Sequence, residues 1–463
     1  MSCSGLTRRS LMAGLGAGAA LAPGFAGLPA HAASVGGYKA LVCVFLFGGM
    51  DNHDVLIPYD QSAYDVFRNS RQGVAPEDSR ARSVLLELSP RNADRFGSRR
   101  FALPPELAGL KRLFDTGRAG IVANVGPLIR PTTRADWEDR LRLPPRLFSH
   151  NDQQSVWQAN APEGARFGWG GLFADAALAS GANPNAEAFT TISTTGDNLF
   201  LTGERTAPYT LGRRGPEQVR VLADADRRRR WKDEYEAIYQ RLRRHFSAEE
   251  FRSDNLLARD VAAVMGRSLA SNEAYQAAVE TPPSLGAAFP QSRLGRQLEI
   301  IAETIAVRSR LGVGRQVFFA GTDGFDTHSG QAGKMPELLA DIDASVSAFQ
   351  TAMDVIGESR DVTLFTASDF GRTFAVNGDG TDHGWGGHHF VVGGAVAGGE
   401  IHGDPPPPGF DHAWDAGGGR LIPSISVDQY AAELGRWFGL SRGELNAALP
   451  NLANFDAGPG LLV

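Results

Sequence analysis

Aspartate and histidine side chains follow three apolar segments whose composition is typical of β-strands, and a fourth group comes soon after the last. They lie in the sequences GGMDNHD (48–54), TDGFDTH (322–328), SDFGRT (368–373) and DHGWGGHH (382–389). The chain holds only ten histidines, and six of them lie from His328 to His412. One aspartate after a strand is more often a helix cap or turn residue, but these groups together favour a shared site. Carboxylate oxygens and imidazole nitrogens suit divalent metals, so the pattern predicts a metal site.

The segments around these groups alternate between strand and helix patterns. Residues 39–47 form a continuous apolar run, which is typical of a central strand covered on both faces. Further strands are predicted at 121–125, 317–321, 362–367 and 389–393, and helices at 104–113, 294–310, 337–356 and 426–440. This alternation predicts an α/β fold with a mostly parallel central sheet and helices on both faces. Ligands bind beyond the carboxyl ends of such strands, where the polar groups should meet.

Residues 218–290 interrupt this alternation. They are rich in Arg, Glu, Ala and Leu at helical spacing, which predicts a mainly helical insertion in a domain spanning 33–463. The arginine run at 227–230 is typical of a solvated helix face, and a phosphate-binding patch is the alternative.

The first 32 residues are typical of a twin-arginine export signal. Arg8 and Arg9 precede a weakly apolar run at 11–28, and Ala30-His31-Ala32 offers a cleavage site. Pro23 and many glycines in the run argue against a membrane anchor. We therefore expect a periplasmic or secreted protein without stable membrane insertion after signal cleavage.

The mature chain that this signal predicts is mildly acidic. Loss of Arg8 and Arg9 with the signal lowers the formal charge from −6 to −8. That charge argues against nucleic acid and against an anionic membrane surface as partners. Cys43 would be the remaining cysteine, so an internal disulfide is excluded.

Five segments resemble a specific bacterial family of exported proteins of unassigned function, domain of unknown function 1501. They are VFLFGGMDNHDVLIPYD near the start, LPPRLFSHNDQQSVWQ (143–158), FDTHSGQ (325–331), TASDFGRT (366–373) and GTDHGWGGHHFVVGGAV (380–396). The resemblance covers essentially the whole mature chain. That family in turn resembles, more distantly, the alkaline phosphatase and sulfatase superfamily of metal-dependent hydrolases.

The distant resemblance implies a set of metal ligands and a nucleophile. Its implied ligands for zinc, manganese or calcium are Asp51, Asp326, His328, Asp369 and His383. Ser149 is implied as the nucleophile at a helix N-terminus, where an anionic ester would be favoured.

This sequence also departs from the superfamily pattern. Phe370 stands where an Asp-His pair would place a ligand after Asp369, so one metal, or a remodelled site that uses His383 and His388, is expected. Val44 and Phe45 after Cys43 exclude the formylglycine mechanism, which needs a Cys-x-Pro-x-Arg sequence.

Three further side chains have two interpretations each. Arg372 could clamp an anionic substrate or form a structural salt bridge. His53 and His150 could act as acid-base groups or as hydrogen-bonded structural residues.

We expect an exported, metal-dependent hydrolase of phosphate or sulfate esters that acts on a small anionic ester or a cell-envelope substrate. The alternative is a non-catalytic binding or assembly protein on a degenerate hydrolase scaffold, with an exported protein partner.

Overall fold

The computed structural model describes residues 36–463 except positions 76, 214, 217–223, 226, 229–231, 247–254 and 457. The predicted export signal lies outside the described residues, as does part of the predicted insertion, including half of its arginine run.

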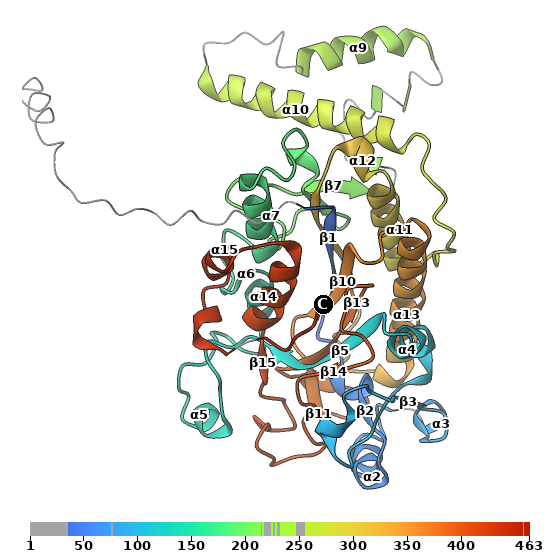
Figure 1. The fold of residues 1–463 in the computed structure, drawn as a ribbon, viewed down its shortest axis with the longest axis vertical. Helices are drawn as coiled ribbons and strands as arrows, with labels where there is room; N and C mark the ends of the chain where they lie inside the picture. Colours follow the sequence, from blue (N-terminus) through green and yellow to red (C-terminus); the bar gives the residue numbers. More distant parts are fainter. Residues whose placement is uncertain are drawn as a thin grey trace, which may run out of the picture. The chain divides into compact units, whose positions relative to one another are not determined.

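Strand β1 (Lys39–Leu46) forms the middle of the central sheet (Figure 1). It pairs in parallel with β10 (Val362–Ser368) on one side and with β9 (Arg315–Thr322) on the other. All residues of β1 after Lys39 are buried, as its uninterrupted apolar sequence predicts.

The sheet is mostly parallel, which confirms the predicted α/β class. Its strand order is β14 (Ile401–His402), β5 (Ala119–Gly126), β13 (Gly387–Val392), β10, β1, β9, β6 (Thr191–Ser193), β7 (Tyr209–Gly212) and β8 (Gly215–Pro216), with β15 (Ile425–Ser426) also paired to β5. Strand β13 runs antiparallel to both of its neighbours, and β8 runs antiparallel to β7. The other pairings are parallel.

Helices cover both faces of the sheet (Figure 1). Alternate side chains of β1 enter two separate cores, as the two-residue period of a strand requires. The first core includes side chains of α4 (Ala108–Asp115), α11 (Arg293–Ala306) and α13 (Gln331–Val355). The second includes side chains of α6 (His150–Ala159), α7 (Trp169–Ala179), α14 (Val427–Phe438) and α15 (Arg442–Ala448).

Smaller elements surround this three-layer arrangement. Within the predicted insertion lie α9 (Glu234–Phe246) and α10 (Leu256–Val279). The others are η1 (Asn52–Asp54), β2 (Ile57–Pro58), α2 (Gln61–Ser70), α3 (Glu77–Arg80), β3 (Leu86–Glu87), η2 (Ala93–Phe96), β4 (Phe101–Leu103), η3 (Pro105–Leu107), α5 (Arg134–Glu138), η4 (Glu187–Phe189), α12 (Arg308–Leu311), β11 (Arg372–Val376), β12 (Thr381–His383) and η5 (Leu452–Asn454). Among the described residues, no helix combines the length and apolar character needed to cross a membrane.

A glycine turn at the end of β1 allows the loops after three neighbouring strands to meet. Gly48 has φ +113°, and a Cβ there would overlap the backbone nitrogen of Asp326 in the loop after β9. The Gly48 N–H donates to Asp369 Oδ1, which follows β10, at 3.1 Å. Gly48 therefore permits the close approach that places polar side chains together at the carboxyl end of the sheet.

The Gly48→Ala variant should be less stable than the wild type by about 1–3 kcal/mol from backbone strain alone. Displacement of the Asp326 loop adds to this cost, because the new Cβ overlaps backbone rather than a mobile side chain. Urea denaturation of both proteins measures the difference. Gly36→Ala is the matched control, since nothing lies within 4 Å of a Cβ at that position. Equal stability of the two variants would contradict this account of the turn.

Candidate metal centre

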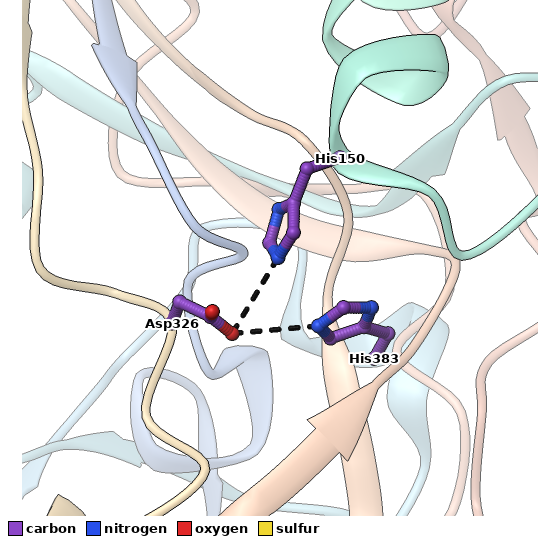
Figure 2. A group of neighbouring side chains, drawn as sticks. All are labelled: His150, Asp326 and His383. Atoms are coloured by element: carbon purple, nitrogen blue, oxygen red, sulfur yellow. Dashed lines mark ion pairs between the residues drawn. The ribbon is translucent and has the colours of Figure 1, made fainter.

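Three histidine side chains surround the carboxylate of Asp326. The Nε2 atoms of His150, His328 and His383 lie 3.5, 3.1 and 3.4 Å from Asp326 Oδ1. His150 begins α6, Asp326 and His328 follow β9, and His383 ends β12. Figure 2 shows His150 and His383 directed at Asp326 from separate elements. Residues from three distant parts of the sequence thus form one group.

Asp369 fixes the orientation of the His150 ring. Its buried Oδ2 lies 2.6 Å from His150 Nδ1 and also accepts a hydrogen bond from Gln154 Nε2 at 2.8 Å. The hydrogen bond from His150 to Asp369 raises the pKa of His150. The Nε2 atom of His150 is buried and has no hydrogen-bond partner among the described residues. A carboxylate that holds one imidazole nitrogen while the other remains free is the usual arrangement behind a metal-bound histidine.

The other two histidines also have their Nδ1 atoms engaged. His383 Nδ1 lies 2.8 Å from the carbonyl oxygen of Phe148, to which it donates, and His328 Nδ1 lies 3.3 Å from Asp382 Oδ1. Their Nε2 atoms are 2.8 Å apart. Two lone pairs at that distance repel unless a proton or a cation lies between them. Burial lowers the pKa of His383, so its Nε2 is an acceptor that either an N–H of His328 or a cation can satisfy.

Arg372 holds Asp326 in its ionised form. The guanidinium is fully buried, and its Nη1 donates to Asp326 Oδ1 at 2.9 Å and to the Gly48 carbonyl at 3.1 Å. Burial by itself raises the pKa of Asp326, but the hydrogen bond and positive charge of Arg372 outweigh it, so the pKa is lowered. A carboxylate must be deprotonated to bind a metal, and Arg372 secures this.

The donor set fits a transition metal such as zinc. Tetrahedral zinc with bonds of about 2.0–2.1 Å to nitrogen holds neighbouring ligand atoms roughly 3.3 Å apart. One ligand atom from each of His150, Asp326 and His383 lies within 4.8 Å of the others, so small movements would close the group around an ion. Calcium takes oxygen ligands, and three imidazoles therefore favour zinc over calcium among the predicted metals.

The structure does not bring Asp51 into this group. Its carboxylate forms a buried ion pair with Arg71 and accepts hydrogen bonds from Gln331 Nε2 and from the backbone N–H of His53. The positive charge that the carboxylate needs is therefore supplied by Arg71 rather than by a metal.

His388 and His53 also lie outside the group. His388 Nδ1 accepts the backbone N–H of Asn124 at 2.9 Å, and burial lowers its pKa to about 4. His53 is buried with Nε2 3.2 Å from the Gly419 carbonyl. Both histidines line a small cavity separate from the Asp326 group, so neither is placed to bind the same ion.

The two remaining predicted residues take supporting positions. The Ser149 hydroxyl donates to Asp152 at 2.8 Å, which directs it along its own helix end rather than toward Asp326. Arg372 directs its donors to Asp326, Gly48 and Thr381, so its contacts fit the salt-bridge interpretation rather than a substrate clamp.

Sequence reasoning missed the residues that orient the three rings. A backbone carbonyl such as that of Phe148 cannot be recognised from residue types. Asp382 stood out in the sequence only as a member of the polar segment at 382–389. Gln154 follows His150 by four residues, so helical spacing could have placed both on one face of α6. Phe370 packs against the rings of His150 and His383, with centroids 4.8 and 4.6 Å away, and closes one side of the group.

A cavity of about 620 Å³ opens beside the metal centre. Both His150 and Asp326 form part of its wall. A small ligand in the cavity can therefore reach the group.

A family model described as "Protein of unknown function (DUF1501)" matches residues 38–417. The chain belongs to this family. The family's description leaves the chemistry of its members open, and no curated protein matches this DUF1501 sequence.

Three solved structures are similar to this DUF1501 protein at 9% identity each. The PsFucS1 sulfatase from Pseudoalteromonas sp. aligns over 92% of this chain and 74% of its own, with a TM-score of 0.36. Ps i-CgsB aligns over 92% and 78%, with a TM-score of 0.38. The lipoteichoic acid synthase LtaP from Listeria monocytogenes aligns over 88% and 73%, with a TM-score of 0.30. These scores are low, and the function proposed below rests on the side chains of the site.

The Asp369→Asn variant should bind zinc about 10–100-fold more weakly than the wild type. The amide keeps the size of the side chain but removes the charge that orients and polarises His150. A competition titration against a zinc chelator measures the two affinities. Asp428→Asn is the control, because Asp428 is a buried carboxylate on α14 outside the group. Unchanged affinity in Asp369→Asn would contradict the role given to Asp369.

Proposed function

We propose that this DUF1501 protein is an exported, metal-dependent hydrolase of phosphate or sulfate esters. The observation that carries the proposal is the buried Nε2 of His150, which makes no hydrogen bond within the described part of the chain and faces Asp326 and His383. The imidazole nitrogens of His150 and His383 and the ionised carboxylate of Asp326 would form a ligand set beside a cavity, with His328 Nε2 next to them. Zinc is the metal that this set favours.

The chain's own residues prepare the site for an anionic ester. His150, His328, His383 and Asp326 would hold the ion, and Arg372 keeps Asp326 ionised. When bound, such an ion supplies a Lewis acid and lowers the pKa of water. The buried ring of Phe370 excludes water from one side of the histidines.

Water is the nucleophile that this arrangement favours. The Ser149 hydroxyl is committed to Asp152, so a covalent intermediate on Ser149 would require that hydrogen bond to break. In direct hydrolysis, the water oxygen bonds to phosphorus or sulfur while the bond to the ester oxygen breaks. One proton of the water leaves with the alcohol, and the phosphate or sulfate keeps the new oxygen. The second proton stays on the phosphate or, with sulfate, passes to the solvent.

The twin-arginine pattern at Arg8 and Arg9 supports export as part of the proposal. Folding before export would let the metal be loaded in the cytoplasm. The alternative function is a non-catalytic binding protein that retains the metal centre and engages an exported protein partner.

Removal of the metal with a chelator should abolish hydrolysis of p-nitrophenyl phosphate or p-nitrophenyl sulfate, and zinc should restore it. The His383→Ala variant should lose kcat/KM by on the order of a hundredfold, because a ligand and its fixed ring are removed together. His388→Gln is the control, since His388 lies outside the group.

Release of p-nitrophenol and elemental analysis of the same samples distinguish the outcomes. Hydrolysis that survives complete metal removal would refute the proposal. Stoichiometric zinc without turnover of either ester would favour the binding-protein alternative.

A further inference from the structure

The cavity beside the metal centre has walls from three parts of the fold. The stripe His150, Gln154 and Gln158 runs along one face of α6, since these residues are four apart. The loops after β6 and β9 form the opposite walls, and Phe47 and Phe319 add apolar surface. The stripe leads from His150 along the cavity wall to the buried Gln158, so a ligand held at the metal can extend along Gln154 and Gln158.

The charges in this cavity are unevenly compensated. Arg293 forms an ion pair with Asp323 at 2.9 Å, and Asp326 is paired with Arg372. Asp197 is exposed, lines the cavity and has no ion-pair partner among the described residues. Within the described part of the cavity wall, the charge that remains unpaired is therefore negative.

Gln154, four residues after His150 on α6, also offers an acceptor. Gln154 uses its Nε2 to donate to Asp369, which leaves its Oε1 as an acceptor without a partner among the described residues. Gln158 uses its Oε1 to accept the N–H of Phe200, so its N–H₂ group remains as a donor. The Asp197 carboxylate and the Gln154 oxygen recognise N–H donors, and the carboxylate repels a second phosphate, sulfate or carboxylate.

We infer that the alcohol part of the substrate carries an ammonium group, which binds to Asp197 while its alkyl stem contacts Phe47. This inference rests on the proposed function, because it takes the anionic ester group to lie at the metal centre. It predicts a substrate class, the phosphate or sulfate esters of amino alcohols, and disfavours esters that carry a second anionic group.

The test compares two phosphate esters of equal length, O-phosphoethanolamine and propyl phosphate, on the zinc-loaded protein. Calorimetry gives both dissociation constants without requiring turnover. The ammonium ester should bind about fivefold more tightly, as expected for one solvent-accessible ion pair. In Asp197→Asn the ratio of the two constants should fall to about one. Asp260→Asn, a change of an exposed aspartate on α10, should retain the wild-type ratio.

Each other outcome overturns the inference. Equal affinities in the wild type, an unchanged ratio in Asp197→Asn, or no binding of either ester would refute recognition of ammonium by Asp197. Tighter binding of glycerol phosphate than of O-phosphoethanolamine would indicate a hydroxyl-rich alcohol instead. Assaying both esters for released phosphate separates the two proposals: binding with the predicted ratio but no hydrolysis refutes the proposed function and leaves the recognition inference supported.

Discussion

The ion pair between Arg372 and Asp326 connects the parts of the chain that form the candidate metal centre. Arg372 begins β11, and its buried guanidinium also contacts the Gly48 carbonyl after β1 and Thr381 of β12. A buried guanidinium is costly to leave without partners. If the loops after β1 and β9 separated from the β11–β12 hairpin, the guanidinium of Arg372 would lose its hydrogen bonds to Gly48 and Asp326. The position of Asp326, and with it the centre of the histidine group, depends on this one residue.

A buried polar network extends from this ion pair away from the metal centre. The Thr381 hydroxyl donates to Gln331 Oε1 and lies 3.2 Å from Arg372 Nε, and Gln331 Nε2 contacts Asp51. Asp51 in turn pairs with Arg71, which caps the end of α2. A connected network of this kind favours one arrangement of its members, because each lost bond leaves a buried polar group unpaired. Asp51 therefore supports the candidate metal centre through these contacts and lies outside the ligand group.

Histidine takes two roles in this fold, as a candidate metal ligand and as a buried structural residue. His150 and His383 have one ring nitrogen held and the other directed at Asp326, so they are arranged as ligands. His388 has its Nδ1 occupied by a backbone N–H and its ring buried elsewhere, so it supports the fold. Phe370 replaces the expected ligand with an apolar wall beside the ligand rings. Among the described residues, His150, Asp326 and His383 form a ligand group for one candidate ion.

A strand that is buried on both faces has apolar residues at nearly every position. The sequence therefore determined the α/β class, through the apolar run at 39–47 and the alternation of strand and helix patterns. The sequence also indicated that Asp326 and His383 belong to one site, since polar residues that follow parallel strands meet at the same edge of the sheet. Only the tertiary structure decided which of these residues face one another. Arg71 reaches Asp51 from another element and neutralises it, and no spacing in the sequence records that approach. The orientation of a histidine ring depends on the hydrogen bond made by its other nitrogen. For His383 that partner is the backbone carbonyl of Phe148, which no residue type in the sequence reveals.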